Sequence, residues 1–420
     1  MKSGRVYAAA ICLAAATICQ NSEASNYEIK TSLGYDFISQ EYFLDSVTTD
    51  STLSLWQLKT DYLDELRGRI SFRYWSGDRR ELELQSSFEQ SNELFRIRLF
   101  ADWRPKLGNN KLGISAELER RDRYKGVSKF GDSYLFGYTR AFIKIPVSAK
   151  VTSKIQFMSE FVRFDSTSEF SFDYYRFGPK IGLTKSFAGF SFLDVNLFLV
   201  ARQVPDSAEL DYLNFGLDGS FFGLMESGDF DLYARFERKD YSRADKQDDH
   251  FRIDFDNRGK INIGGNSIMR IELSSDFVFY SPDDQVNFDY NRHLLALLAG
   301  YQKDGWEVAI GPEFGLLLEQ EGSLNTVENY FEIGGRIDLE LLKAGRFFGS
   351  VESILGYRNL KIEDQLQTNF VYERITTIGN FQLGNGLNLN WLFSAEWEWH
   401  DLRQENSQIF LLSSSLSYSL

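Results

Sequence analysis

The feature of this sequence that most limits its fold is an alternation of apolar and polar residues with a period of two. In residues 93–104, apolar side chains take the odd positions from Phe95 to Trp103, and arginine and aspartate take most even positions. Similar segments of 10 to 14 residues recur up to the C-terminus. This period predicts β-strands with one apolar and one polar face. Each segment is long enough to cross a bilayer when tilted, for which about 9–11 residues suffice.

The connections between these segments alternate in length. Short turns are expected near residues 105–110, 146–149, 185–189, 223–228, 264–267, 302–305, 343–346 and 384–386. Longer loops are expected near residues 122–132, 163–169, 203–209, 240–249, 281–287, 320–328, 360–367 and 400–407. Several short turns contain hairpin residues, such as Asp304-Gly305. Tight turns on one side and longer loops on the other are typical of transmembrane β-barrels.

The strand count depends on the first 75 residues. Separate strands at 51–60 and 66–75 would give 21, and an odd number would place the two termini on opposite sides of a membrane. Merging 51–75 into one strand gives 20, as does leaving 27–38 outside the wall. We therefore predict an all-β fold in which residues 25–420 form a single closed antiparallel transmembrane barrel of about 20 strands, with 18–22 acceptable.

The width of such a barrel determines which face meets lipid. Even 16–18 strands leave an aqueous channel, so side chains cannot fill the interior of a barrel of about 20 strands. The apolar side chains must then face hydrocarbon, and a charge on that face costs about 2–4 kcal/mol at mid-depth. A helical membrane protein is excluded, because the longest apolar stretch after residue 24 is about eight residues, around Leu294–Tyr301. A net charge of −14 without a long basic block argues against nucleic-acid binding.

The N-terminus predicts export. A positively charged start, an apolar stretch at residues 6–18 and small residues at Ser22 and Ala24 are typical of a secretory signal peptide spanning residues 1–24. Both cysteines of the chain fall within this segment. The mature protein would then fold without disulfides or thiolate metal sites.

The C-terminal segment carries a family resemblance. Phe410, Leu412, Leu416, Tyr418 and Leu420 alternate up to the last residue. This pattern resembles the C-terminal assembly signal of bacterial outer-membrane proteins, with Leu420 where the usual terminal residue is Phe. Together with the signal peptide and the rhythm of strands and turns, it resembles Gram-negative outer-membrane, porin-like β-barrels, without indicating a subfamily. The resemblance implies a multi-pass location in the outer membrane, contact with lipid and lipopolysaccharide, and insertion by the barrel-insertion machinery.

Charged side chains on the polar faces form ladders of alternating sign on successive strands. Opposite charges on neighbouring strands can pair across one face. One interpretation is a charged wall that orders ions or sugar hydroxyls along a pore, and the other, favoured for any single residue, is a set of salt bridges that stiffen the wall. Basic and acidic ladders nearly balance, so they indicate no strong ion preference. The candidate pore-lining residues are Arg67, Arg69, Arg73, Glu81, Glu83, Arg96, Arg98, Arg104, Glu117, Glu119, Arg252, Asp254, Arg270 and Glu272.

Six of the longer loops are acidic. Together they contain 14 Asp and Glu against 4 Lys and Arg, and they are the loops at 203–209, 240–249, 281–287, 320–328, 360–367 and 400–407. They could form an anionic vestibule that concentrates cations. The alternative, which we favour, is ordinary solvated loops, bridged to lipopolysaccharide by divalent cations.

Two Gly-Pro pairs interrupt strand patterns, at Gly178-Pro179 and Gly311-Pro312. Proline cannot donate to a strand ladder, so each pair predicts a bulge or bend.

The sequence does not indicate an enzyme. Only His250, His293 and His400 are available as catalytic histidines. Neither a serine elbow nor metal-ligand spacing accompanies them, so we expect no catalytic or metal site and no cofactor.

Three functions remain open from sequence. The first is a passive channel for small hydrophilic solutes through a charge-lined lumen. The second is an outer-membrane conduit of an export system, for example for polysaccharide. The third is a non-conducting structural or adhesive barrel in which the wall charges serve packing.

Overall fold

A computed structural model of the chain describes residues 27–46, 55–76, 81–91, 94–123, 133–165, 172–205, 207–242, 249–281, 289–319, 329–343, 346–360, 368–384, 386–401 and 406–419. The expected signal peptide at residues 1–24 lies outside these ranges, as do most of the expected acidic loop residues. Within the described ranges, no helix is long and apolar enough to cross a membrane.

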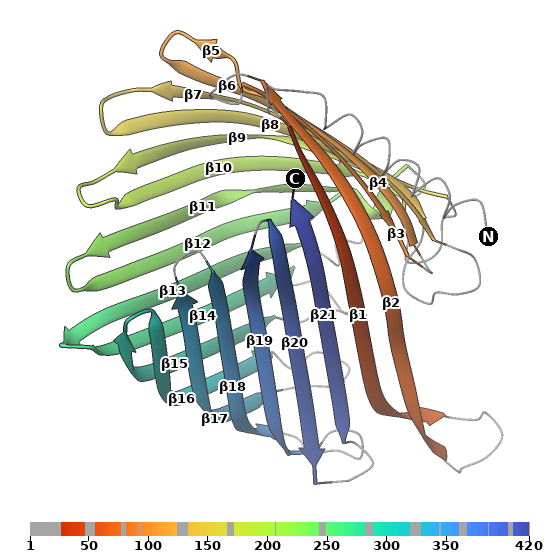
Figure 1. Ribbon diagram of the computed structural model, residues 1–420, viewed down its shortest axis with the longest axis vertical. Helices are drawn as coiled ribbons and strands as arrows, with labels where there is room; N and C mark the ends of the chain where they lie inside the picture. The colour runs from red at the N-terminus through yellow and green to blue at the C-terminus, as the bar shows by residue number, and fades with distance from the viewer. Residues whose placement is uncertain are drawn as a thin grey trace.

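The described chain folds into one antiparallel sheet that closes on itself (Figure 1). Its strands are β1 (Tyr27–Ser46), β2 (Leu55–Ser76), β3 (Leu82–Gln90), β4 (Leu94–Trp103), β5 (Lys106–Leu107), β6 (Asn110–Arg123), β7 (Tyr134–Pro146), β8 (Val151–Phe164), β9 (Tyr174–Ser186), β10 (Phe192–Gln203), β11 (Tyr212–Met225), β12 (Gly228–Tyr241), β13 (His250–Gly264), β14 (Ser267–Tyr280), β15 (Tyr290–Lys303), β16 (Trp306–Glu319), β17 (Tyr330–Lys343), β18 (Phe347–Leu360), β19 (Phe370–Gly384), β20 (Leu387–His400) and β21 (Ser407–Ser419). Apart from the short β5, each strand pairs with the strands before and after it in the chain, and β1 pairs with β21 from Lys30–Ser419 to Glu41–Gln408, which closes the barrel.

The wall has 20 strands, as the sequence predicts. The described residues form 21 strands, but β5 is a two-residue pairing at the tip of the hairpin between β4 and β6, which also pair directly. The merged segment is one strand, β2, and Tyr27–Ile38 belongs to the wall as part of β1. At one end of the barrel, β1 and β2 extend beyond their neighbours (Figure 1).

Turn length alternates between the two ends of the barrel, again as predicted. At one end the strands are joined by short connections such as Asp304-Gly305 between β15 and β16, where φ is 48° and 85°. Both residues have positive φ, as a two-residue hairpin turn of type I′ requires. At the other end, connections such as 281–289 and 361–369 are longer. In the outer-membrane barrels that the sequence resembles, the end with short turns faces the periplasm.

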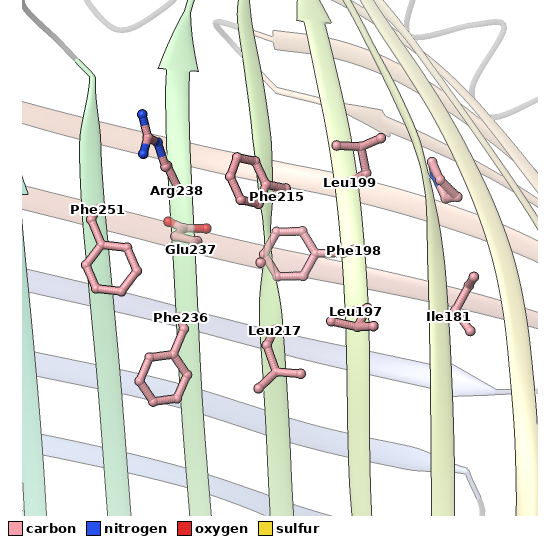
Figure 2. A pocket seen from close by; sticks show the side chains of 12 residues that line it. Ile181, Leu197, Phe198, Leu199, Phe215, Leu217, Phe236, Glu237, Arg238 and Phe251 are labelled. Carbon is pink, nitrogen blue, oxygen red and sulfur yellow. The ribbon is translucent and has the colours of Figure 1, made fainter.

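Large apolar side chains lie on the outside of the wall. Leu197 is 61% exposed, and Ile181 is 54% exposed. Figure 2 shows part of this surface, where Leu197, Ile181, Phe215 and Phe236 border a shallow groove across β9 to β12. Such a continuous apolar belt on the outside of a closed sheet is stable where hydrocarbon rather than water surrounds it.

Tryptophans lie near the strand ends, as expected for interfacial girdles. Trp103 ends β4 and Trp306 begins β16, and both are exposed on the outer face. Trp399 lies near the opposite rim and is also exposed. Trp75 differs, because it stands in register with Glu83, whose carboxylate binds Arg73 on the inner face. It therefore belongs to the inner rim rather than to a lipid-facing girdle.

The Gly-Pro pairs interrupt the ladder without a bulge. Pairing of β9 with β10 stops at Lys180–Phe198 and resumes in the same register at Phe177–Ala201. Pairing of β15 with β16 likewise omits two residue pairs around Gly311-Pro312 and keeps its register. Of the two expected irregularities, a bulge or a bend, the unchanged register excludes the bulge at both sites. The missing proline donor removes ladder bonds locally, while the paired strands on each side hold the alignment.

Candidate functional site

The inner face of the wall is identified by contacts between strands that are not neighbours. Arg270 on β14 reaches Asp338 on β17, although β15 and β16 lie between them. Neighbouring strands are roughly 4.8 Å apart, so side chains three strands apart meet only on a concave surface. Because directly paired residues share a face, this contact assigns the charged side chains of the alternating pattern to the inside.

A chain of ion pairs runs across the first five long strands of this inner face. Asp36 on β1 binds Arg67 on β2, and Arg67 Nη1 lies 3.4 Å from Glu89 on β3. Arg96 on β4 then lies 3.7 Å from Glu89 and 3.2 Å from Glu119 on β6. Charges of alternating sign on successive strands therefore pair laterally, which stiffens the wall against shear between strands.

The structure brings most of the candidate pore-lining residues into ion pairs, either between strands or between residues two apart in the chain. The measured pairs are Arg73–Glu83 at 2.7 Å, Arg98–Glu117 at 2.8 Å, Arg104–Asp102 at 2.8 Å, Arg252–Asp254 at 2.9 Å, Arg270–Asp338 at 2.5 Å and Glu272–Arg336 at 3.0 Å. Two candidates differ. Arg69 makes no ion pair with any described residue, and Glu81 is exposed just before β3, where its carbonyl accepts a hydrogen bond from Arg104 N.

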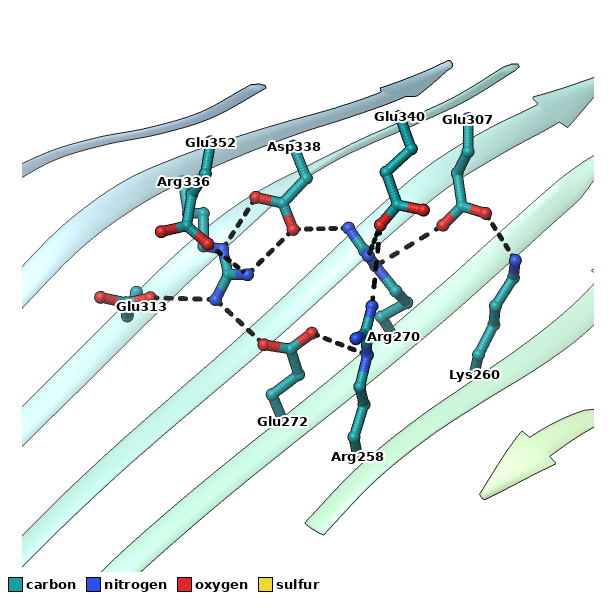
Figure 3. A network of polar contacts seen from close by, with 10 residues as sticks. All are labelled: Arg258, Lys260, Arg270, Glu272, Glu307, Glu313, Arg336, Asp338, Glu340 and Glu352. Atoms are coloured by element: carbon teal, nitrogen blue, oxygen red, sulfur yellow. Dashed lines mark hydrogen bonds and ion pairs between the residues drawn. The ribbon is translucent and has the colours of Figure 1, made fainter. Parts of the chain in front are cut away.

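A second network of ten residues spans β13 to β18 (Figure 3). Its members are Arg258, Lys260, Arg270, Glu272, Glu307, Glu313, Arg336, Asp338, Glu340 and Glu352. Two arginines cross the same gap in opposite directions. Arg270 reaches from β14 to Asp338 and Glu340 on β17, at 2.5 and 3.3 Å, and Arg336 reaches from β17 to Glu272 on β14, at 3.0 Å. The network therefore ties β13, β14, β16, β17 and β18 together across their inner face.

The inner positions of β15 and β16 beneath this network carry small or apolar side chains. Ala296, Leu298 and Ala309 are each 1% exposed, and Gly300 and Gly311 lie at neighbouring inner positions. This arrangement explains the longest apolar stretch of the mature sequence, Leu294–Tyr301. Its inner residues Ala296 and Leu298 are buried beneath the network, so polar side chains are not needed at these two positions, whereas Leu294 on the same face is exposed.

The network shows what sequence reasoning missed. Arg336, Asp338 and Glu340 occupy the polar face of β17, and the alternation places them there. Their partners Glu272 and Arg270 lie more than 60 residues earlier in the sequence. Arg336 and Glu272, for example, are 64 residues apart. Alternation identifies a face, but it contains no signal for pairing between strands that are not neighbours.

The three histidines do not form one site. His250 lies on β13 with its ring 5.3 Å from Tyr280. His293 on β15 contacts Ser275 Oγ through Nδ1 at 3.0 Å, on the outer face. His400 on β20 has Nε2 3.6 Å from Glu398. Among the described residues, no group of three or more His, Cys, Asp or Glu could hold a metal ion.

At the end of the barrel with long connections, a charged pair links β6 to the residue after β8. Arg120 donates to Asp165 through Nη1 at 2.7 Å. This hydrogen bond lowers the pKa of the exposed Asp165 carboxyl below its ordinary value.

Comparison with solved structures agrees with the architecture. The chain is similar to the siderophore receptor PirA from Pseudomonas aeruginosa, with a TM-score of 0.53 and 10% identity over 93% of this chain and 80% of that one. It is similar to PirA from Acinetobacter baumannii, with a TM-score of 0.51 and 8% identity over 95% and 81%. It is also similar to Pseudomonas aeruginosa OprD, with a TM-score of 0.50 and 12% identity over 94% and 96%. No protein-family model and no curated protein matches the sequence.

The closed wall, its apolar belt and these likenesses agree on one class. The protein has the fold of an outer-membrane β-barrel. In an outer-membrane β-barrel the backbone N–H and C=O groups form their hydrogen bonds within the closed sheet, and lipid surrounds the outer side chains. The charged inner face is then the surface on which a function for this barrel has to be sought.

Proposed function

We propose that this barrel is a porin-like channel that lets small hydrophilic solutes cross the outer membrane by diffusion through a charge-lined lumen, without a cofactor. The observation that carries the proposal is the combination of 20 strands with charged inner side chains. Barrels of 16–18 strands already enclose an aqueous channel. Water in the lumen would solvate the sides of the arginines and carboxylates that face away from their partners.

The described chain contains little besides wall. Apart from strands and turns, the described residues include a single 3₁₀ helix of three residues, Ala208–Leu210, between β10 and β11. None of these described segments is a domain that could fill the lumen. Of the candidate pore-lining residues, Arg98 offers solute the more open side chain, 45% exposed, and Arg96 the less open, 30% exposed.

The test is single-channel conductance of the purified full-length mature protein in planar lipid bilayers. We expect stepwise conductance from the wild type, and an altered conductance or ion selectivity for Arg67→Ala, Arg96→Ala and Arg98→Ala. Arg238→Ala is the matched control, because Arg238 lies on the outer side of β12 beside Asp240. Absence of conductance would contradict the channel. Normal conductance and selectivity in all three inner variants would contradict their role in lining it.

A non-conducting structural barrel is the second candidate, favoured by the network of β13 to β18. Ion pairs that cross two intervening strands brace the wall whether or not solute passes. The same conductance measurement separates the two candidates. An export conduit stays an alternative that no described contact favours.

We also propose that outer-membrane lipid and lipopolysaccharide surround the belt. The alternating residues of β21 would be recognised by the barrel-insertion machinery during biogenesis.

A further inference from the structure

A row of lysines crosses the inner wall near the end with short turns. Lys111 on β6 is directly paired with Lys144 on β7, and Lys144 is directly paired with Lys154 on β8. Directly paired residues share a face, so three ammonium groups lie on one face of three successive strands. Like charges placed directly opposite each other destabilise a sheet. Another directly paired set of cations on the inner face, Lys260 and Arg270, differs because both lie against the carboxylate of Glu307.

Arg140 joins the row from the middle of β7, and one aromatic ring lies among the cations. The centroid of Phe142 is 5.8 Å from Arg140 Cζ, 5.9 Å from Lys144 Nζ and 5.8 Å from Lys154 Nζ. These contacts hold the three cations around a common centre. Arg140 Nε is buried and has no hydrogen-bond partner among the described residues. We call Lys111, Arg140, Lys144 and Lys154 the basic cluster.

The carboxylates that flank the basic cluster are engaged elsewhere. Glu117 accepts from Arg98 at 2.8 Å, and Asp102 accepts from Arg104 at 2.8 Å. Asp194 accepts from Thr184 Oγ1 at 2.7 Å and from Asn196 Nδ2 at 3.0 Å. Within the described part of the chain, no member of the basic cluster has a carboxylate within ion-pair distance, whereas Arg67, Arg96 and Arg270 each have at least two.

We propose that the basic cluster is a binding site for multivalent oxyanions of the phosphate type, located on the inner wall near the periplasmic mouth. Four cations without carboxylates favour a ligand that carries more than one negative charge. Ammonium and guanidinium groups are the usual protein partners of phosphate oxygens. The bound anion supplies the negative charge that this sector of the wall lacks. This site deepens the proposed channel function, on which its position in a solute pathway depends.

The test measures block of single-channel conductance by inorganic pyrophosphate added to either side of the bilayer. We expect concentration-dependent block of the wild type, and at least a tenfold higher half-blocking concentration for Lys144→Gln combined with Lys154→Gln. The matched control is Arg202→Gln combined with Lys239→Gln. It removes the same charge from the inner wall near the other end, where both cations lie over Tyr212. The control should change the half-blocking concentration by less than twofold.

Three outcomes overturn the proposal: no block of the wild type, equal effects of the two double variants, or equal block by acetate at matched ionic strength. The last would indicate that any anion suffices. If the protein forms no channel, the proposed function fails separately, and titration calorimetry of pyrophosphate into the detergent-solubilised protein still tests the site. Folding of each variant is checked by its heat-dependent shift on a gel. If the double variant does not fold, the single substitution Lys144→Gln is used for the same measurement, because the Lys144 side chain is exposed.

Discussion

Replacing Arg270 by alanine tests whether the network of β13 to β18 stabilises the barrel. The Arg270 side chain is 2% exposed, with Nη2 2.5 Å from Asp338, Nη1 3.3 Å from Glu340 and Nε 3.7 Å from Glu307. Breaking a buried ion pair by removing one partner costs about 3–5 kcal/mol, because the remaining charge stays buried without compensation.

The structure places the expected loss at the lower end of that range. Asp338 keeps Arg336 at 2.8 Å, and Glu307 keeps Lys260 at 2.5 Å, so each carboxylate retains one cation. We therefore expect Arg270→Ala to lower the free energy of unfolding by about 3 kcal/mol. Arg270→Met keeps most of the side-chain volume. It should lose a similar amount if the charge rather than the packing matters.

The assay is reversible denaturant unfolding of the barrel in lipid vesicles, followed by tryptophan fluorescence. The control is Arg238→Ala, which removes an arginine from an exposed pair with side chains 59% and 36% exposed, and should lose no more than about 1 kcal/mol. Equal losses from Arg270→Ala and Arg238→Ala would refute the reasoning, as would a loss below about 1 kcal/mol from Arg270→Ala.

Two further substitutions test the outer face and the close approach of strands. Leu197→Arg places a charge on the 61%-exposed outer side chain of β10 and should cost about 2–4 kcal/mol in vesicle unfolding, whereas Leu197→Met should be nearly neutral. Unchanged stability of Leu197→Arg would mean that this face does not meet hydrocarbon. Gly311→Ala would place a Cβ 1.9 Å from the Leu297 carbonyl oxygen and should reduce the folded fraction on a heat-shift gel. Gly335→Ala, with nothing within 4 Å, should fold normally, and equal folding of both variants would contradict the close packing of β15 on β16.

The architecture could be predicted from sequence because every strand repeats one simple rule. The alternation in 93–104 assigns Arg96 and Arg98 to the face opposite Leu99, and the structure agrees. Asp304-Gly305 marks a hairpin because two positive φ angles suit these residues. These signals are local, so each strand and each turn can be predicted from its own segment of sequence.

The arrangement of charges around the barrel could not be predicted in the same way. The row formed by Lys111, Lys144 and Lys154 depends on the register of three strands, and a shift of one residue would separate it. The contact of Arg270 with Asp338 depends on the curvature of the wall over β15 and β16. A bulge or a bend is expected at Gly311-Pro312, and the structure shows no bulge, because the sequence shows the missing donor but not the flanking pairs that preserve alignment.

The crossing of Arg270 over β15 and β16 has a consequence for assembly. Arg270 and Asp338 are 68 residues apart, whereas Arg374 and Glu396, on adjacent strands, are only 22 apart. The Arg270 guanidinium lacks its nearest carboxylate until both β14 and β17 stand in the wall. The four strands from β14 to β17 would therefore gain this contact together, as one cooperative unit.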